Sequence, residues 1–270
     1  MTSAATIVCV HAHPDDEAFF GGGASAHYAA LGHRLVLVTC TLGQLGYDGA
    51  GRAGNVQGHD ALDAMAHRAG ELQRAASLLG FSRVVTLGYD DSGMAGWPEN
   101  ESESAFMNAD VEAVAATIAS ILDHENAQVV ITYDESGFYG HPDHVRANAV
   151  ARAAVQLSSS VERLYYSVVP TGVMSSVVSD AAARGLSMPA WVLDAGSRID
   201  PALVTTTLDV SDLVALKREA MAAHATQIDN KDLIEMDDEV FARLFRTEWY
   251  QRAWSRHETG GDETDLVGGL

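Results

Sequence analysis

The sequence predicts an α/β fold, a Rossmann-like, mostly parallel sheet with helices on both faces and a carboxy-terminal cap. Two observations predict it. Short, continuous apolar runs recur up to about residue 170, and each is too short for a helix of ordinary length. Segments with helical apolar spacing separate these runs, and this alternation favours right-handed crossovers between parallel strands.

Five of the apolar runs are predicted strands. Their continuous apolar character is typical of strands that are buried on both faces. They cover residues 6–10, 34–39, 83–87, 129–133 and 164–169.

Four segments between the strands are predicted helices, because apolar residues recur in them at helical spacing. Gly32 and Gly80 follow two of them and are typical helix ends. The four cover residues 18–31, 61–79, 110–122 and a segment that opens near residue 142 and runs to about residue 157.

Two long segments, 43–59 and 88–108, lack periodicity and are predicted loops of the kind that usually carry function. After Pro170 the pattern weakens, and only 212–224 and 237–255 are predicted helices. We expect a single domain over 1–270. Its α/β core covers about 1–170, and its cap covers about 171–270 and completes the pocket.

Charge and composition restrict the function. The chain has 37 acidic and 17 basic residues among 270, a net charge of −20, which disfavours nucleic-acid and membrane partners. No apolar stretch approaches the roughly 18 residues of a membrane span, and run 6–10 is too short for a signal peptide. We therefore expect a cytoplasmic protein, and a homo-oligomer is compatible with the sequence. Cys9 and Cys40 lie in apolar runs and are interpreted as buried.

Two polar clusters directly follow the first and fourth predicted strands. They read His-Ala-His-Pro-Asp-Asp-Glu at 11–17 and Tyr-Gly-His-Pro-Asp-His at 139–144. In open α/β sheets, ligand sites form at the carboxyl ends of the strands. The two clusters are therefore predicted to form one site, although more than a hundred residues separate them.

The clusters contain the ligands of a hydrolytic metal site. His13, Asp16 and His144 supply two imidazole nitrogens and one carboxylate, and a fourth position is left for water. This donor set favours one Zn²⁺ per chain, with Fe²⁺ as the alternative. His11 is interpreted as a supporting residue.

The remaining polar residues of the clusters suit hydrolysis. Asp15, between two ligands, is the natural general base for the attacking water. His141 can stabilise a tetrahedral oxyanion and protonate the leaving nitrogen. Asp143 can orient His141. Tyr139 can donate to the substrate carbonyl or form only a pocket wall. The residues predict a metal-dependent hydrolase without choosing its substrate.

At these residues the chain resembles the zinc-dependent de-N-acetylases related to N-acetylglucosaminyl-phosphatidylinositol deacetylase (LmbE-like), which carry His-Pro-Asp-Asp-Glu and His-Pro-Asp-His motifs. The resemblance is closest to the mycothiol branch, which comprises the precursor deacetylase and the conjugate amidase. Supporting segments are 38–43, 91–96, 132–134, 222–227 and 263–266.

The resemblance implies zinc on the three ligands above, Asp15 as the base, His141 as the acid and Tyr139 as a mobile carbonyl-polarising residue. It implies Arg68, Asp91 and Met94 as substrate-binding residues. The implied reaction releases acetate from an amino-sugar substrate, an N-acetylglucosaminyl compound, and N-acetylglucosaminyl-inositol of the mycothiol pathway is the first expectation.

The chain also departs from the precursor deacetylase. Gln44-Leu45-Gly46-Tyr47 replaces an acid-rich stretch, Phe19 and Phe20 are bulkier than usual, and 225–229 is closer to the amidase. Alternatives therefore include the conjugate amidase, a deacetylase of another amino-sugar metabolite, and a non-catalytic sugar-binding protein. The intact ligands and Asp15 argue against the last.

Overall fold

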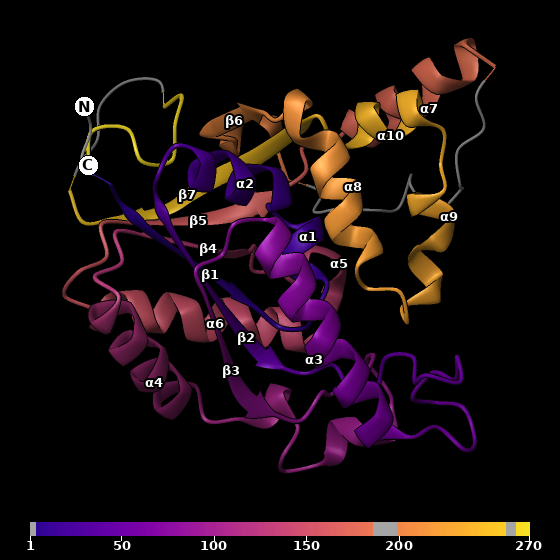
Figure 1. Ribbon diagram of the computed structural model, residues 1–270. Helices are drawn as coiled ribbons and strands as arrows, with labels where there is room; N and C mark the ends of the chain where they lie inside the picture. Colours follow the sequence, from indigo (N-terminus) through magenta and orange to yellow (C-terminus); the bar gives the residue numbers. More distant parts are fainter. Residues whose placement is uncertain (1–3, 186–198, 258–262) are drawn as a thin grey trace.

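The computed structural model describes residues 4–185, 199–257 and 263–270, and its centre is a seven-stranded sheet (Figure 1). The strand order is β3-β2-β1-β4-β5-β7-β6. The first five strands are parallel, whereas β7 pairs antiparallel with both β5 and β6. The strands are β1 (Thr6–His11), β2 (Arg34–Thr41), β3 (Arg83–Tyr89), β4 (Val129–Tyr133), β5 (Arg163–Val168), β6 (Thr206–Asp209) and β7 (Thr247–Ser255).

Helices pack on both faces of this sheet, as the sequence predicts. None within the described residues is long and apolar enough to cross a membrane. The helices are α1 (Asp16–Phe19), α2 (Gly22–Ala30), α3 (Ala61–Leu78), α4 (Val111–His124), α5 (Gly137–Gly140), α6 (Pro142–Leu157), α7 (Val173–Ala183), α8 (Val214–Ala222), α9 (Lys231–Ile234) and α10 (Asp238–Phe245).

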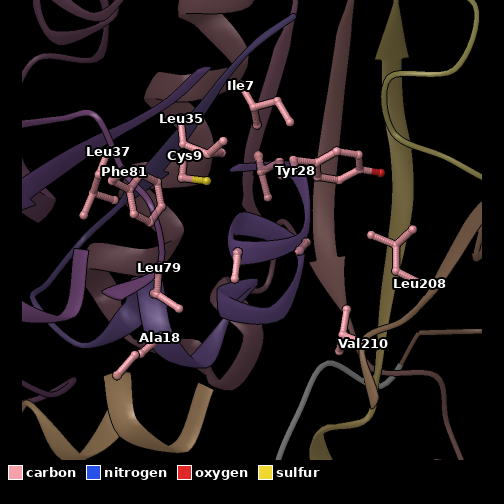
Figure 2. Packing of buried hydrophobic residues seen from close by; sticks show 14 of the residues in the cluster. Ile7, Cys9, Ala18, Tyr28, Leu35, Leu37, Leu79, Phe81, Leu208 and Val210 are labelled. Carbon is pink, nitrogen blue, oxygen red and sulfur yellow. The ribbon is translucent and has the colours of Figure 1, made fainter. Parts of the chain in front are cut away.

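The sheet separates two apolar cores, and alternate residues of β1 point into each. Ile7 and Cys9 join a core beneath α2, α3, α8 and α10, whereas Val8 and Val10 join the core beneath α4 and α6. Figure 2 shows the first core, in which Leu208 from the carboxy-terminal part belongs to the same cluster. Both cysteines are buried and free, as predicted.

The predicted helix 18–31 is wrong in one respect, because the structure divides it into α1 and α2. Gly21 stands at the break with a φ of 138°, which side chains other than glycine rarely adopt. Gly23 then brings α2 against the sheet, since an added Cβ there would lie 2.7 Å from Val210. The glycine run therefore serves close packing.

The predicted helix 237–255 is also wrong in its second half. Helix α10 ends at Phe245, and β7 follows, paired between β5 and β6. Its first residues alternate in burial, with Glu248 and Tyr250 buried between less buried neighbours, which is the period of a strand. Tertiary pairing and aromatic content outweighed helical propensity here.

The carboxy-terminal part contributes sheet strands as well as helices. Strands β6 and β7 extend the sheet beyond β5, and α8 and α10 pack on the face that also carries α2 and α3 (Figure 1). The segments 43–59 and 88–108 contain no α-helix, as predicted, although β3 extends into the second segment as far as Tyr89. The carboxyl ends of β1 and β4 thus lie at the centre of the sheet, flanked by β2 and β3 on one side and by β5 and β7 on the other.

Candidate active site

The structure brings the two polar clusters together at the carboxyl ends of β1 and β4. The ring of His13 lies 4.5 Å from that of His141 and 5.2 Å from that of His144, measured between centroids. All three rings are buried. Two segments about 130 residues apart therefore form one buried group of imidazoles, with carboxylates beside it.

Two imidazole nitrogens and the Asp16 carboxylate form a triangle with nearly equal edges at this point, and the two edges that end on Asp16 end on different oxygens of its carboxylate. His13 Nδ1 lies 3.3 Å from His144 Nε2 and 3.5 Å from Asp16 Oδ2, and His144 Nε2 lies 3.4 Å from Asp16 Oδ1. Zinc bonds to nitrogen and oxygen are about 2.0–2.1 Å long, so tetrahedral ligand atoms lie about 3.3–3.4 Å apart. The three side chains therefore fit a tetrahedral metal ion.

Hydrogen bonds orient both imidazoles for metal binding. His13 Nε2 donates to Asp143 Oδ2 at 3.1 Å, and His144 Nδ1 donates to the carbonyl of Gly137 at 3.2 Å. A carboxylate and a carbonyl can only accept, so these nitrogens carry the protons. The nitrogens that face the triangle are left with free lone pairs, which is the tautomer that a metal requires.

The third donor, Asp16, is held as a carboxylate. Its Oδ2 accepts from the backbone N–H of His13 at 2.8 Å and from the Tyr133 hydroxyl at 2.5 Å. Burial alone would raise the pKa of Asp16, but His144 and His13 outweigh burial and hold this pKa well below its usual range. The ring of Tyr133 also stacks on His144, 4.1 Å away.

Two other groupings among the described residues have metal-ligand spacing: His13 with His141 and His144, and His13 with Asp91, His141 and Asp143. The second grouping uses the Nε2 edge of His13, which already donates to Asp143. The triangle with Asp16 has both of its imidazole lone pairs free, and it fits the predicted ligand set.

Asp15 stands beside the triangle in a strained conformation. Its φ is 101°, an uncommon value outside glycine, and such strain is typical of functional sites. Its carboxylate is 20% exposed and lies 3.4 Å from the Arg68 guanidinium. Burial raises the pKa of Asp15 to about 6, against the lowering effect of Arg68. A carboxylate with this pKa suits a general base near neutral pH.

A buried pair, Glu17 and His224, supports Asp15, and the sequence patterns assigned no role to this pair. Glu17 Oε2 accepts the backbone N–H of Asp15 at 3.0 Å, and Glu17 Oε1 lies 2.6 Å from His224 Nε2. Glu17 and His224 are both fully buried. The signals were Glu17 at the end of the first motif and His224 within segment 222–227, but nothing in one sequence pairs residues 207 positions apart.

His141 is placed as a neutral hydrogen-bond donor. Its Nδ1 accepts from the backbone N–H of Asp143 at 3.1 Å, so Nε2 carries the proton in the neutral ring. Burial lowers the pKa of His141 to about 2, and His13 and His144 contribute. The carboxylate of Asp143 contacts His13 and Ser92 instead of His141, because Asp143 lies in the first turn of α6, where its backbone meets the His141 side chain.

Tyr139 is 53% exposed and lies on the short α5 segment at the mouth of the site. Its ring centroid is 5.0 Å from that of His144 and 6.1 Å from that of His141. The preceding Phe138 has a φ of 66°, and Gly137, whose added Cβ would lie 2.8 Å from the Val145 backbone, also has a positive φ. This backbone presents the phenol to the site.

Of the three predicted substrate-binding residues, two brace the loops. Arg68 is buried and donates to the carbonyls of Gly43 and Pro14. Asp91 accepts backbone N–H bonds from Leu45 at 3.2 Å and Gly93 at 2.8 Å.

Asp91 also lies 3.7 Å from His13 Nε2, and His13 is the main reason that the pKa of Asp91 falls well below its usual range although burial opposes this. Met94 is 42% exposed and lies beyond Asp91 on the same loop. Arg68 and Asp91 thus lie on the polar side of the site, toward the loops that follow β2 and β3.

Comparison with known proteins identifies the family. The family model "GlcNAc-PI de-N-acetylase" (PIG-L) matches residues 8–155, which include both clusters. The chain belongs to this family. A 1D-myo-inositol 2-acetamido-2-deoxy-alpha-D-glucopyranoside deacetylase of Streptomyces scabiei is 36% identical over 98% of this chain and 89% of its own length. One from Actinosynnema mirum is 38% identical over 84% of this chain and 82% of its own length. The chain is thus an amide hydrolase of the deacetylase type.

Solved structures agree with the α/β fold. The N,N'-diacetylchitobiose deacetylase of Pyrococcus horikoshii has a TM-score of 0.59 and 20% identity, and the match covers 93% of this chain and 84% of that one. At such identity the likeness concerns the fold alone. Function therefore has to be argued from the site.

Proposed function

We propose that the protein is a zinc-dependent N-deacetylase, and that its substrate is an N-acetylglucosaminyl compound of the kind named for its relatives, 1D-myo-inositol 2-acetamido-2-deoxy-α-D-glucopyranoside. The reaction replaces the amide C–N bond with a C–O bond from water and yields acetate and a free amine on the sugar. The relatives that deacetylate this inositol-linked sugar support the choice of substrate.

The triangle of His13 Nδ1, Asp16 and His144 Nε2 is the observation that carries the proposal. Its edges of 3.3–3.5 Å match one tetrahedral ion and leave a fourth position open. The chemistry that Zn²⁺ supplies when bound is Lewis acidity, which polarises a carbonyl and acidifies water. Fe²⁺ suits the same donors, and reconstitution with each metal distinguishes the two.

The protein's own residues then perform the proton transfers. Asp15, with its pKa raised to about 6, takes a proton from the attacking water. Neutral His141 donates an N–H hydrogen bond toward the developing oxyanion or the leaving nitrogen, and Tyr139 donates its hydroxyl to the carbonyl oxygen. The proton that Asp15 took from water passes to the leaving nitrogen as the C–N bond breaks. Glu17 and Arg68 hold Asp15 in place throughout.

The test is amine release by zinc-loaded protein from the inositol-linked N-acetylglucosamine. Plain N-acetylglucosamine and a mycothiol conjugate serve as competing substrates, and the Asp15→Asn variant is the control. Fast release from the inositol compound, lost in the variant, is the expected result. Preference for the conjugate would reassign the protein as an amidase. Absence of release from any amide, with metal bound, would contradict the proposal.

A further inference from the structure

His224 is a buried histidine of the carboxy-terminal part of the chain, and none of the proton transfers above uses it. It lies just beyond the end of α8, where its backbone N–H donates to the carbonyl of Met221 at 3.2 Å. Its ring is fully buried, with Nε2 at 2.6 Å from Glu17 Oε1. Within the described residues its Nδ1 has no hydrogen-bond partner. An unpaired buried nitrogen destabilises a fold, so the hydrogen bond to Glu17 is what the position of His224 serves.

Glu17, on α1, connects His224 with Asp15. A carboxylate can only accept hydrogen bonds. Glu17 Oε1 therefore accepts from His224, and Glu17 Oε2 accepts from the backbone N–H of Asp15 at 3.0 Å. In the described part of the chain, His224 is the only basic side chain within ion-pair distance of Glu17. Without His224, one oxygen of a buried carboxylate loses its donor. Glu17 must then turn toward another donor, which disturbs its bond to Asp15.

Asp15 depends on this bond because its backbone is strained. Its φ is 101°, and its side chain makes no capping hydrogen bond at the start of α1, which leaves the carboxylate available to the attacking water. Such a conformation persists only where the surrounding structure holds it. Glu17 holds the N–H of Asp15, and Arg68 holds the carbonyl of the preceding Pro14. A catalytic group that moves by about 1 Å can lose about a hundredfold in rate.

Separate hydrogen bonds fasten the segment that carries His224 to α3. The backbone N–H and the hydroxyl of Thr226 both donate to the Glu71 carboxylate, each at 2.8 Å. Glu71 is buried and lies one turn along α3 from Arg68. Neither bond involves Glu17 or Asp15. Thr226 therefore stabilises the same segment without taking part in the connection to Asp15.

We propose that His224 is a positioning residue for Asp15. Through Glu17 it keeps the backbone of the general base in the conformation that aims the Asp15 carboxylate at the attacking water. The His224 ring itself is fully buried and does not touch the substrate. The inference rests on the proposed function, because it needs Asp15 to act as the base. The effect should appear in kcat, since the base acts in the chemical step, and only weakly in KM.

The experiment measures amine release from the inositol-linked N-acetylglucosamine by zinc-loaded full-length protein. His224→Leu removes the donor to Glu17, and we expect kcat to fall roughly tenfold or more, with KM close to that of wild type. His224→Gln should recover most of kcat, because its amide nitrogen reaches about as far as Nε2 of histidine. His224→Asn is too short to reach Glu17 and should be as slow as His224→Leu. The Gln and Asn variants decide the question if His224→Leu does not fold.

The matched control is Thr226→Val, in the same segment. It removes the hydroxyl bond to Glu71 and keeps the backbone bond, so we expect a lower melting temperature with kcat close to wild type. Thermal melting and zinc content are measured for every variant. An equal loss of kcat in Thr226→Val and His224→Leu would overturn the inference, because any loosening of the segment would then slow the reaction.

A double variant tests whether His224 acts through Asp15. Residues that act through one group are not additive. Asp15→Asn combined with His224→Leu should therefore be as slow as Asp15→Asn alone. A further tenfold loss in the double variant would mean that His224 acts on something other than the base, and would overturn the inference.

The remaining outcomes separate this inference from the proposed function. Wild-type kcat in folded, zinc-loaded His224→Leu would overturn the positioning role and leave the deacetylase intact. Loss of zinc together with kcat would also overturn it, because His224 would then support the proposed ligand Asp16 instead of the base. No amine release by wild-type protein would remove the proposed function and this inference together.

Discussion

The two sides of the proposed metal site differ in how they are built. Toward β2 and β3, polar side chains are held by backbone groups, as Asp91 is by Leu45 and Gly93. Toward β5 and β7, apolar side chains from several helices surround a cavity of about 600 Å³. The polar side is rigidly hydrogen-bonded and suits chemistry and sugar hydroxyls. The apolar side is shaped by packing and suits substrate selection.

The largest expected effect on turnover comes from removing a proposed metal ligand, which lies between the two sides. His144→Ala removes one corner of the donor triangle, and we expect bound metal to fall and amine release to drop to background. Metal content by elemental analysis and turnover are measured together. His67→Ala, at a half-exposed histidine on α3, is the matched control. Full metal content in His144→Ala would exclude it as a ligand.

The next largest effect concerns the base at the boundary of the two sides. Asp15→Asn keeps the shape of the side chain, and asparagine tolerates the φ of 101° better than alanine does. Loss of a general base costs roughly a hundredfold or more in kcat. Bound metal should stay unchanged, since Asp15 is outside the triangle. Near wild-type turnover would reject Asp15 as the base.

A smaller effect is expected from Tyr133, a residue to which the sequence patterns assigned no role. Tyr133→Phe keeps the ring stacked on His144 but removes the hydroxyl that donates to Asp16 Oδ2. Loss of such a supporting hydrogen bond costs about 10–100-fold in metal affinity or activity. Metal titration and turnover measure it, with Tyr166→Phe on β5 as the control. Equal values for Tyr133→Phe and wild type would show that Asp16 needs no support.

The contrast between the two sides also explains what the sequence could predict. The strands of the core are continuous apolar runs, and the proposed metal ligands lie in two short motifs, so both could be predicted from local pattern. Tyr133 lies in the supporting segment 132–134, but its role was hidden because, as the last residue of an apolar strand, it looks like core. His224 was hidden because its partner Glu17 is 207 residues away.

The apolar side was harder still to predict. Its walls are single residues from different elements, such as Met174 and Phe245, and an isolated apolar residue has no signature beyond burial. Strand β7, which supplies Trp249 to the wall, was predicted as helix because its pairing partners lie elsewhere in the chain. Cavities made by packing distant elements depend on tertiary structure, which periodicity does not contain.

The last prediction concerns the free energy of unfolding, and we expect it to affect turnover least. It tests the apolar side, because the stability that Glu248 contributes there should depend on pH. Burial alone would raise the pKa of Glu248, but the Lys217 charge beside it outweighs burial and lowers this pKa below its ordinary value. The folded-state pKa thus lies below the unfolded pKa of about 4.3. Glu248 therefore contributes stability that is complete above that pH and is lost as pH falls through the folded value.

Glu248→Gln isolates this contribution, because the proposed metal ligands are the same in both proteins. At neutral pH the variant leaves Lys217 buried without its charge partner, and we expect a loss of roughly 3 kcal/mol in the free energy of unfolding. That difference should shrink as pH falls below about 4, because the unfolded chain takes up a proton on Glu248 before the folded protein does, until Glu248 is neutral in both states. Urea unfolding of both proteins in chelator, at steps from neutral pH downward, measures it. A difference that stays constant down to about pH 3 would mean that the pair does not hold Glu248 ionised, and that the floor of the cavity is stabilised by packing alone.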